Sequence, residues 1–206
     1  LVRMMQMLSM GHHLQKNISE GQLFGLENIY DHYLSEGAAN RMNVYLKEKW
    51  EKPGSRYHVM KGMFSCLHKL EALSADWPGK IRHYEKILFS GGRKKYKALH
   101  QYRMPDKIAE QLLSYFIYVY FAGAVYDGMP YSKIKLAVIS TMLIEDIVCA
   151  TAAEKGELTF EEIADAAHSY AREVEHSDLN LQRLSIMFRH QKCFHIGRLC
   201  GALLEW

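Results

Sequence analysis

Two acids and a histidine, Glu173, Glu175 and His176, lie close together in the segment SYAREVEHSDLNLQRL, residues 169–184. Glu173 and His176 are three residues apart, so on a helix they share one face. A Glu-x-x-His pair can ligate metal in carboxylate bundles, but such a site takes two of these pairs and two further glutamates. The sequence has one pair, and we therefore predict no metal site. Alternatively, His176 is a catalytic base oriented by Glu173, and Arg172 binds an anion.

The interpretation we favour for this segment is a corner between two helices. His176 would lie in the last turn of a helix over 160–176, where the helix dipole favours a cation. Ser177 would cap the next helix, with Asp178 in its first turn. Any function then depends on what the corner faces, so Arg172, Glu173 and His176 remain candidate catalytic residues.

Two further acids, Glu145 and Asp146, stand in an otherwise apolar helix predicted over 134–153. A carboxylate in a buried helix must be paired or must raise its pKa. We expect one of the two to face solvent and the other to meet a lysine or arginine of a neighbouring helix. The alternative is a pocket carboxylate that receives a cationic substrate such as a lysine amine, which makes Glu145 the fourth candidate catalytic residue.

Positive charge is concentrated between residues 80 and 107, where nine Lys or Arg against two acids give +7 in a chain of net +3. Such a segment can bind nucleic acid or an acidic protein surface. No helix-turn-helix or RNA-binding motif accompanies it, so nucleic acid is not the expected partner. The alternative is a solvated, mobile loop. The candidate partner-binding residues are Arg93, Lys94, Lys95, Lys97 and Arg103.

The cysteines predict neither a disulfide nor a zinc site. Cys66 and Cys149 fall in apolar helical phases, as reduced core residues of a cytoplasmic protein do. Cys193 and Cys200 would be about 10 Å apart along one helix, beyond the ~7 Å that a disulfide spans. His190-x-x-Cys193 has no second pair with zinc spacing.

Apolar residues recur at spacings of three and four nearly throughout, which predicts an all-α protein. We predict one domain over residues 1–206, a bundle of about eight or nine helices. Ser19–Gln22 and Thr159–Glu162 have the pattern of capping boxes.

Residues 112–126 and 134–153 are apolar almost all round, but the first is short and the second carries charges, so neither is expected to span a membrane. We predict that they form a buried central hairpin. The predicted helices cover 2–14, 23–34, 42–50, 60–73, 81–89, 108–126, 134–152, 163–174 and 179–204.

The order of these patterns resembles the C-terminal helical region of the flagellin lysine N-methylase family. The resemblance rests on EQLLSYFIYVYFAGAVYDG, on the small-residue helix that leads into ELTFEEI, and on the corner SYAREVEH. The earlier stretch CLHKLEALSADWPG also fits, and the first helices match loosely.

This resemblance implies a bacterial protein-lysine N-methyltransferase that uses S-adenosylmethionine and acts on a flagellin-like protein substrate. Family members carry a cysteine-rich, metal-holding cluster near their N-terminus, and this chain has none. The chain would then be the C-terminal part of a longer protein, inactive by itself. Arg172, Glu175 and His176 would form a pocket or interface wall. The alternative from another class is a non-enzymatic ligand- or partner-binding module of a regulator.

Overall fold

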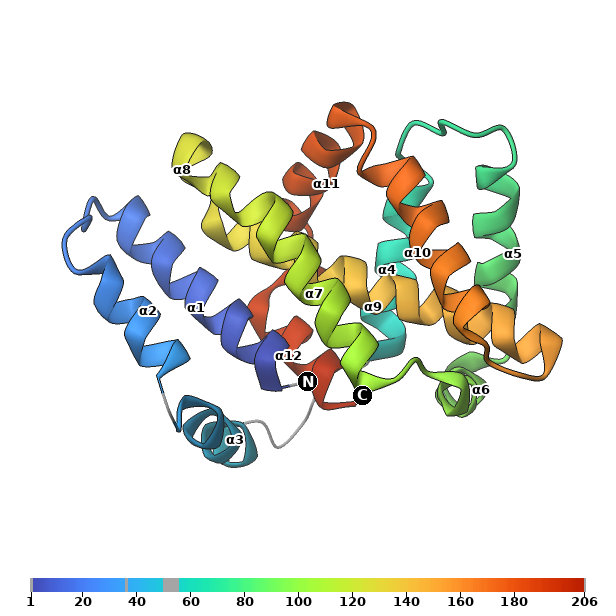
Figure 1. Cartoon of the computed structure of the whole chain (residues 1–206), viewed down its shortest axis with the longest axis horizontal. Coiled ribbons are helices and arrows are strands. Elements are labelled where there is room, and N and C mark those ends of the chain that lie inside the picture. Colours follow the sequence, from blue (N-terminus) through green and yellow to red (C-terminus); the bar gives the residue numbers. More distant parts are fainter. Residues whose placement is uncertain (1, 36, 50–55, 206) are drawn as a thin grey trace. The chain divides into compact units, whose positions relative to one another are not determined.

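Helices are the regular structure throughout the computed structural model, which describes residues 2–35, 37–49 and 56–205 and contains no strand among them (Figure 1). The all-α prediction is confirmed for these residues. They group into two compact units. Unit 1 comprises Leu1–Val59, Leu113–Val138 and Phe188–Trp206, and unit 2 comprises Met60–Leu112 and Ile139–Met187. The single domain over 1–206 stays a prediction.

Unit 1 is built around α1, which packs against α2, α3 and α12 (Figure 1). Gly11 lets α1 approach α9 closely, because a Cβ at this position would lie 2.7 Å from Cδ1 of Ile134. Parts of α4, α7, α9 and α11 complete the unit. The elements are α1 (Val2–Ser19), α2 (Leu26–Leu34), α3 (Ala38–Lys49), η2 (Phe121–Gly123), α8 (Ala124–Asp127), η3 (Lys192–Phe194) and α12 (Ile196–Leu204).

Unit 2 contains α5, α6 and α10 together with the remainder of the four helices that contribute to both units. Its core includes the fully buried side chains of Phe64, Leu88 and Tyr170. The elements are α4 (Arg56–Leu67), α5 (Trp77–Phe89), α6 (Gly92–Leu99), η1 (His100–Tyr102), α7 (Asp106–Tyr120), α9 (Pro130–Lys155), α10 (Phe160–Val174) and α11 (Asp178–His190).

The helix α9 is a core helix. Length and apolarity alone would let both Pro130–Lys155 and Asp106–Asp127 cross a membrane. In the most apolar stretch of Pro130–Lys155, however, 89% of residues are buried inside the protein. Packing within the protein accounts for the apolar character of α9, since burial of each large aliphatic side chain contributes about 1.5–3 kcal/mol.

The predicted buried hairpin needs correction in its first arm. Only 17% of the corresponding stretch of Asp106–Asp127 is buried. In the part of α7 that belongs to unit 1, Leu113 and Phe116 face inward, whereas Tyr115 and Tyr118 face solvent. Tyrosine counts as an apolar residue in a sequence pattern, but its hydroxyl can hydrogen-bond to water. A helix rich in tyrosine can therefore have one buried and one solvent-exposed face.

The helix ends test the predicted caps. Thr159 caps α10 in a full capping box with Glu162, whose carboxylate accepts from the Thr159 backbone N–H at 2.8 Å. The box predicted at Ser19 is wrong, because α1 continues through Ser19 and α2 begins after Gly25. A tertiary contact accompanies the longer α1: Gln15 donates to the carbonyl of Gly128 at 3.0 Å.

The residues described contain twelve α-helices, more than the eight or nine predicted. The predicted helix over 179–204 is interrupted by η3 between α11 and α12, without a proline or glycine to mark the break. Likewise, α8 is separated from α7 by η2, and α6 was not predicted as a helix. Position 50, the predicted end of one helix, lies outside the described residues.

We expect Thr159→Ala to lower the free energy of unfolding by about 1 kcal/mol, because it removes the side-chain oxygen that caps α10. Urea titration followed by circular dichroism measures the change. Thr151→Ala is the matched control, since Thr151 only donates to the Ile147 carbonyl within α9 and caps nothing. Equal effects of the two substitutions would contradict a capping role for Thr159.

Candidate functional site

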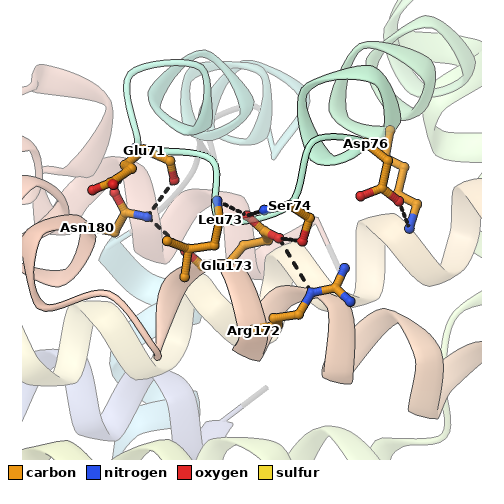
Figure 2. Close-up of polar contacts among 8 residues, drawn as sticks. Glu71, Leu73, Ser74, Asp76, Arg172, Glu173 and Asn180 are labelled. Carbon is orange, nitrogen blue, oxygen red and sulfur yellow. Dashed lines mark hydrogen bonds and ion pairs between the residues drawn. The ribbon is translucent and has the colours of Figure 1, made fainter.

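Glu173 lies buried at the end of α10 and binds the loop between α4 and α5 (Figure 2). Its carboxylate accepts hydrogen bonds from the backbone N–H groups of Leu73 at 2.8 Å and Ser74 at 3.3 Å, and from the Ser74 hydroxyl. A buried carboxylate needs such donors in place of water. Glu173 therefore fixes the loop to α10.

Asn180 holds the same loop from the first turn of α11. Its amide oxygen accepts from the Glu71 N–H at 2.8 Å, and its amide nitrogen donates to the carbonyls of Glu71 and Glu173, each at 2.8 Å. The predicted Ser177 cap is confirmed, because the Ser177 hydroxyl accepts from the Asn180 N–H at 3.2 Å. Glu173 and Asn180 thus join the α10–α11 corner to a loop about a hundred residues earlier in the chain (Figure 2).

Arg172 and His176 lie at the surface of this corner. Arg172 is half exposed, with its Nε 3.5 Å from the Glu173 carboxylate (Figure 2). A hydrogen bond from Lys80, and more weakly the charge of Arg172, hold the pKa of Asp76 below its ordinary value. His176 is exposed and lies beyond the end of α10, which stops at Val174 rather than at 176.

The catalytic dyad considered for this corner lacks its orienting contact in the described structure. The hydrogen bonds described for the Glu173 carboxylate go to the loop, and none of them joins it to His176. Among the described residues there is also no group of three or more His, Cys, Asp or Glu placed to hold a metal ion. The geometry supports the helix corner, with Arg172 and His176 available to a partner.

Both acids of α9 are fully buried, so the expectation that one of them faces solvent is wrong. Asp146 accepts a hydrogen bond from the Tyr96 hydroxyl at 2.7 Å, and its other oxygen lies 3.2 Å from Nε2 of His100. Nδ1 of His100 lies 3.0 Å from the Tyr96 carbonyl. Sequence reasoning missed Tyr96 and His100 as the partners of this acid.

The environment of His100 suits an anchor better than an acid–base catalyst. A carbonyl oxygen can only accept, so Nδ1 donates to Tyr96, and Nε2 faces a carboxylate. Both ring nitrogens are thereby occupied, and neither is available to a substrate.

The anchor positions the basic helix α6, which carries most of the predicted partner-binding residues. Tyr96 is buried and stacks on Phe89, with ring centroids 5.5 Å apart. Its neighbours on α6 point outward: Arg93, Lys94, Lys95 and Lys97 are all exposed. Arg103 follows η1 and pairs with Asp106. The segment interpreted alternatively as a mobile loop is a helix with four exposed cations, and we call its solvent-exposed side the basic face of α6.

Glu173→Gln should lower the free energy of unfolding by about 2 kcal/mol, because an amide cannot accept all the hydrogen bonds that the carboxylate does. Hydrogen exchange at the Leu73 and Ser74 amides should accelerate as well. Glu157→Gln, at an exposed acid in a loop of the same unit, is the control. Unchanged exchange at Leu73 and Ser74 would show that Glu173 does not hold the loop.

Tyr96→Phe should lower the free energy of unfolding by about 1 kcal/mol, because it leaves Asp146 with one fewer hydrogen-bond donor while the ring still stacks on Phe89. Amide exchange within residues 92–102 should rise more than elsewhere in unit 2. Tyr118→Phe is the matched control, since the Tyr118 side chain is 87% exposed. Equal responses of the two variants would mean that the hydroxyl of Tyr96 does not anchor α6.

Comparison with known proteins identifies the family. The model of the family described as the FliB lysine N-methylase C-terminal domain matches residues 2–202, almost the whole chain. No curated protein and no solved structure matches it. The resemblance drawn from the motifs within residues 66–79 and 110–184 is thereby confirmed, and the chain belongs to the family of FliB lysine N-methylase C-terminal domains.

Proposed function

We propose that this domain serves the S-adenosylmethionine-dependent methylation of protein lysine by docking the protein substrate on the basic face of α6. The observation that carries the proposal is the anchoring of α6: Tyr96 and His100 bind the buried Asp146, while four cations of the helix point to solvent. A helix fixed in this way presents its charges in one arrangement, which is what recognition of a surface requires.

The chemistry of the face favours an acidic protein surface as its occupant. α6 contains no acidic residue, so its cations attract negative charge and repel positive charge. Long-range attraction of this kind accelerates encounter and orients the partner, and it weakens as salt rises. A flagellin-like substrate would place acidic residues on α6, and a lysine elsewhere on the substrate would then reach the methyl donor.

The proposal assigns different roles to the four candidate catalytic residues. Arg172 and His176 lie at the surface of the α10–α11 corner and would contact the substrate or a neighbouring part of the enzyme. Glu173 is engaged by the loop, and Glu145 is fully buried, so both would support the frame. We place the methyl donor, the catalytic chemistry and any metal outside this chain, and the protein in the cytoplasm, away from membranes and nucleic acid.

Charge reversal on α6 tests the docking role. We expect Lys94→Glu with Lys95→Glu to weaken binding of purified flagellin about tenfold at low salt. The helix itself should survive, because acidic residues in the first turn favour the helix dipole. The control, Lys61→Glu with Lys69→Glu, reverses two exposed lysines of the same unit and changes the net charge equally. Equal weakening by both pairs, or by neither, would contradict docking on α6.

Calorimetric titration of S-adenosylmethionine into this chain separates docking from donor binding. Heat that does not saturate at millimolar donor, together with salt-sensitive flagellin binding, is the expected result. Saturable donor binding would instead place part of the donor pocket in this chain, and Glu145, Arg172 and His176 would be mutated first. Binding of neither probe would favour the alternative, a partner-binding module of a regulator.

A further inference from the structure

Unit 1 contains a cavity of about 420 Å³ that is unrelated to the basic face of α6. It lies where the end of α1, the start of α9, the end of α11 and the start of α12 meet. Five of its nine lining residues carry ammonium, guanidinium or imidazole groups, and none is acidic. These five are His12, Lys16, Lys135, Arg189 and His195.

Lys135 supplies a positive charge inside the protein. The residue is only 4% exposed, and its ammonium donates to the carbonyl of Phe188 at 2.7 Å and lies 4.2 Å from the centre of the Tyr131 ring. Both of these partners are neutral. An ammonium can donate three hydrogen bonds and needs a counter-charge when buried. Burial accordingly lowers the pKa of Lys135 to about 8.

A second buried donor lies beside this lysine. The hydroxyl of Tyr131 is buried and has no hydrogen-bond partner among the described residues, and Tyr131 lines the same cavity. A buried hydroxyl without a partner costs about 1–3 kcal/mol. An anion placed in the cavity would provide the counter-charge for Lys135.

The start of α12 lies at the same cavity. His195 occupies the N-cap position of α12, but its side chain makes no capping hydrogen bond to the helix. Both His195 and Ile196 line the cavity. The first N–H groups of a helix have no partner within it, and they carry partial positive charge. Together with the cationic side chains, they form the kind of environment in which proteins bind phosphate.

We propose that this cavity of unit 1 is a binding site for a small molecule that carries a phosphate group, with Lys135, Arg189 and the start of α12 as its main donors. A tetrahedral dianion accepts hydrogen bonds from several directions at once, which suits donors contributed by four helices. The volume leaves room for a modest organic portion, because ligand pockets span roughly 300–1,000 Å³. A sulfonium donor would be repelled, so the site is distinct from one for S-adenosylmethionine.

Titration calorimetry of the whole chain with inorganic phosphate and with adenosine monophosphate, in low-salt buffer at pH 7, tests the proposal. We expect saturable binding of both, weakened about tenfold by Arg189→Gln, a change at an exposed side chain, and by Lys135→Met. Lys133→Met is the matched control. Lys133 belongs to the same helix but pairs with Asp127 at 2.7 Å and does not line the cavity. The Lys133→Met variant should bind phosphate with the same affinity as the unsubstituted chain.

Several outcomes would overturn the proposal. The first is the absence of saturable binding at phosphate concentrations up to about 10 mM, which is on the order of the weakest useful dissociation constants. Another is equal weakening by Lys133→Met and Arg189→Gln, because the effect would then reflect net charge alone. Binding of citrate without binding of phosphate would assign the cavity to carboxylates.

The dependence on pH provides an independent readout. Phosphate affinity should fall about tenfold between pH 7 and pH 9.5, because Lys135, with its pKa at about 8, loses its proton over this range. The pKa of His12 is lowered by burial, then by Lys135, His13 and Lys16, so His12 contributes little charge at either pH. The fall should be absent in Lys135→Met, and a fall of the same size in that variant would overturn the role of Lys135. The charged or titratable groups described around Lys135 are His12 and Lys16 on α1, Tyr131 on α9, Arg189 on α11, Cys193 on η3, and His195 at the N-cap of α12.

Discussion

The need to satisfy a buried carboxylate organises much of unit 2. Asp146 lies within a core helix, where water cannot reach it, and its hydrogen bonds must come from the protein. Tyr96 and His100 supply them, and both belong to one short stretch of chain, α6 and η1. The buried acid therefore determines where α6 lies and which of its faces is left for the lysines. A polar group in the core thus positions a charged surface.

Glu173 acts in the same way on the loop between α4 and α5. The carboxylate accepts hydrogen bonds from the N–H groups of Leu73 and Ser74. Asn180 accepts from the Glu71 N–H and donates to the Glu71 carbonyl. A loop without regular structure has backbone groups that need partners, and two buried side chains provide them here. The residues that first suggested catalysis at this corner divide accordingly: Glu173 supports the structure, whereas Arg172 and His176 remain at the surface.

Unit 1 contains the converse situation, a buried cation with no acid among the partners described for it. In unit 2 the buried carboxylates of Asp146 and Glu173 have donors from the protein itself. In unit 1 the ammonium of Lys135 meets a carbonyl and an aromatic ring, and the neighbouring Tyr131 hydroxyl has no described partner. The difference is one of charge balance. A site whose positive charge no described lining residue neutralises suits a negatively charged ligand, and a helix N-terminus at the same cavity increases that preference.

The sequence by itself determined the features that depend on neighbours in the chain. Periodicity identified the helical class, the caps at Thr159 and Ser177 were readable because each involves residues three apart, and the cations of α6 were visible as a cluster. Composition and motif order were enough to indicate the family. Only the tertiary structure decided the rest, because those contacts join residues far apart in sequence: Glu173 with Leu73, Asp146 with Tyr96, and Lys135 with Phe188. The exposure of Tyr115 and Tyr118 on α7 was equally beyond the sequence, since a tyrosine suits either a core or a surface until its neighbours are known.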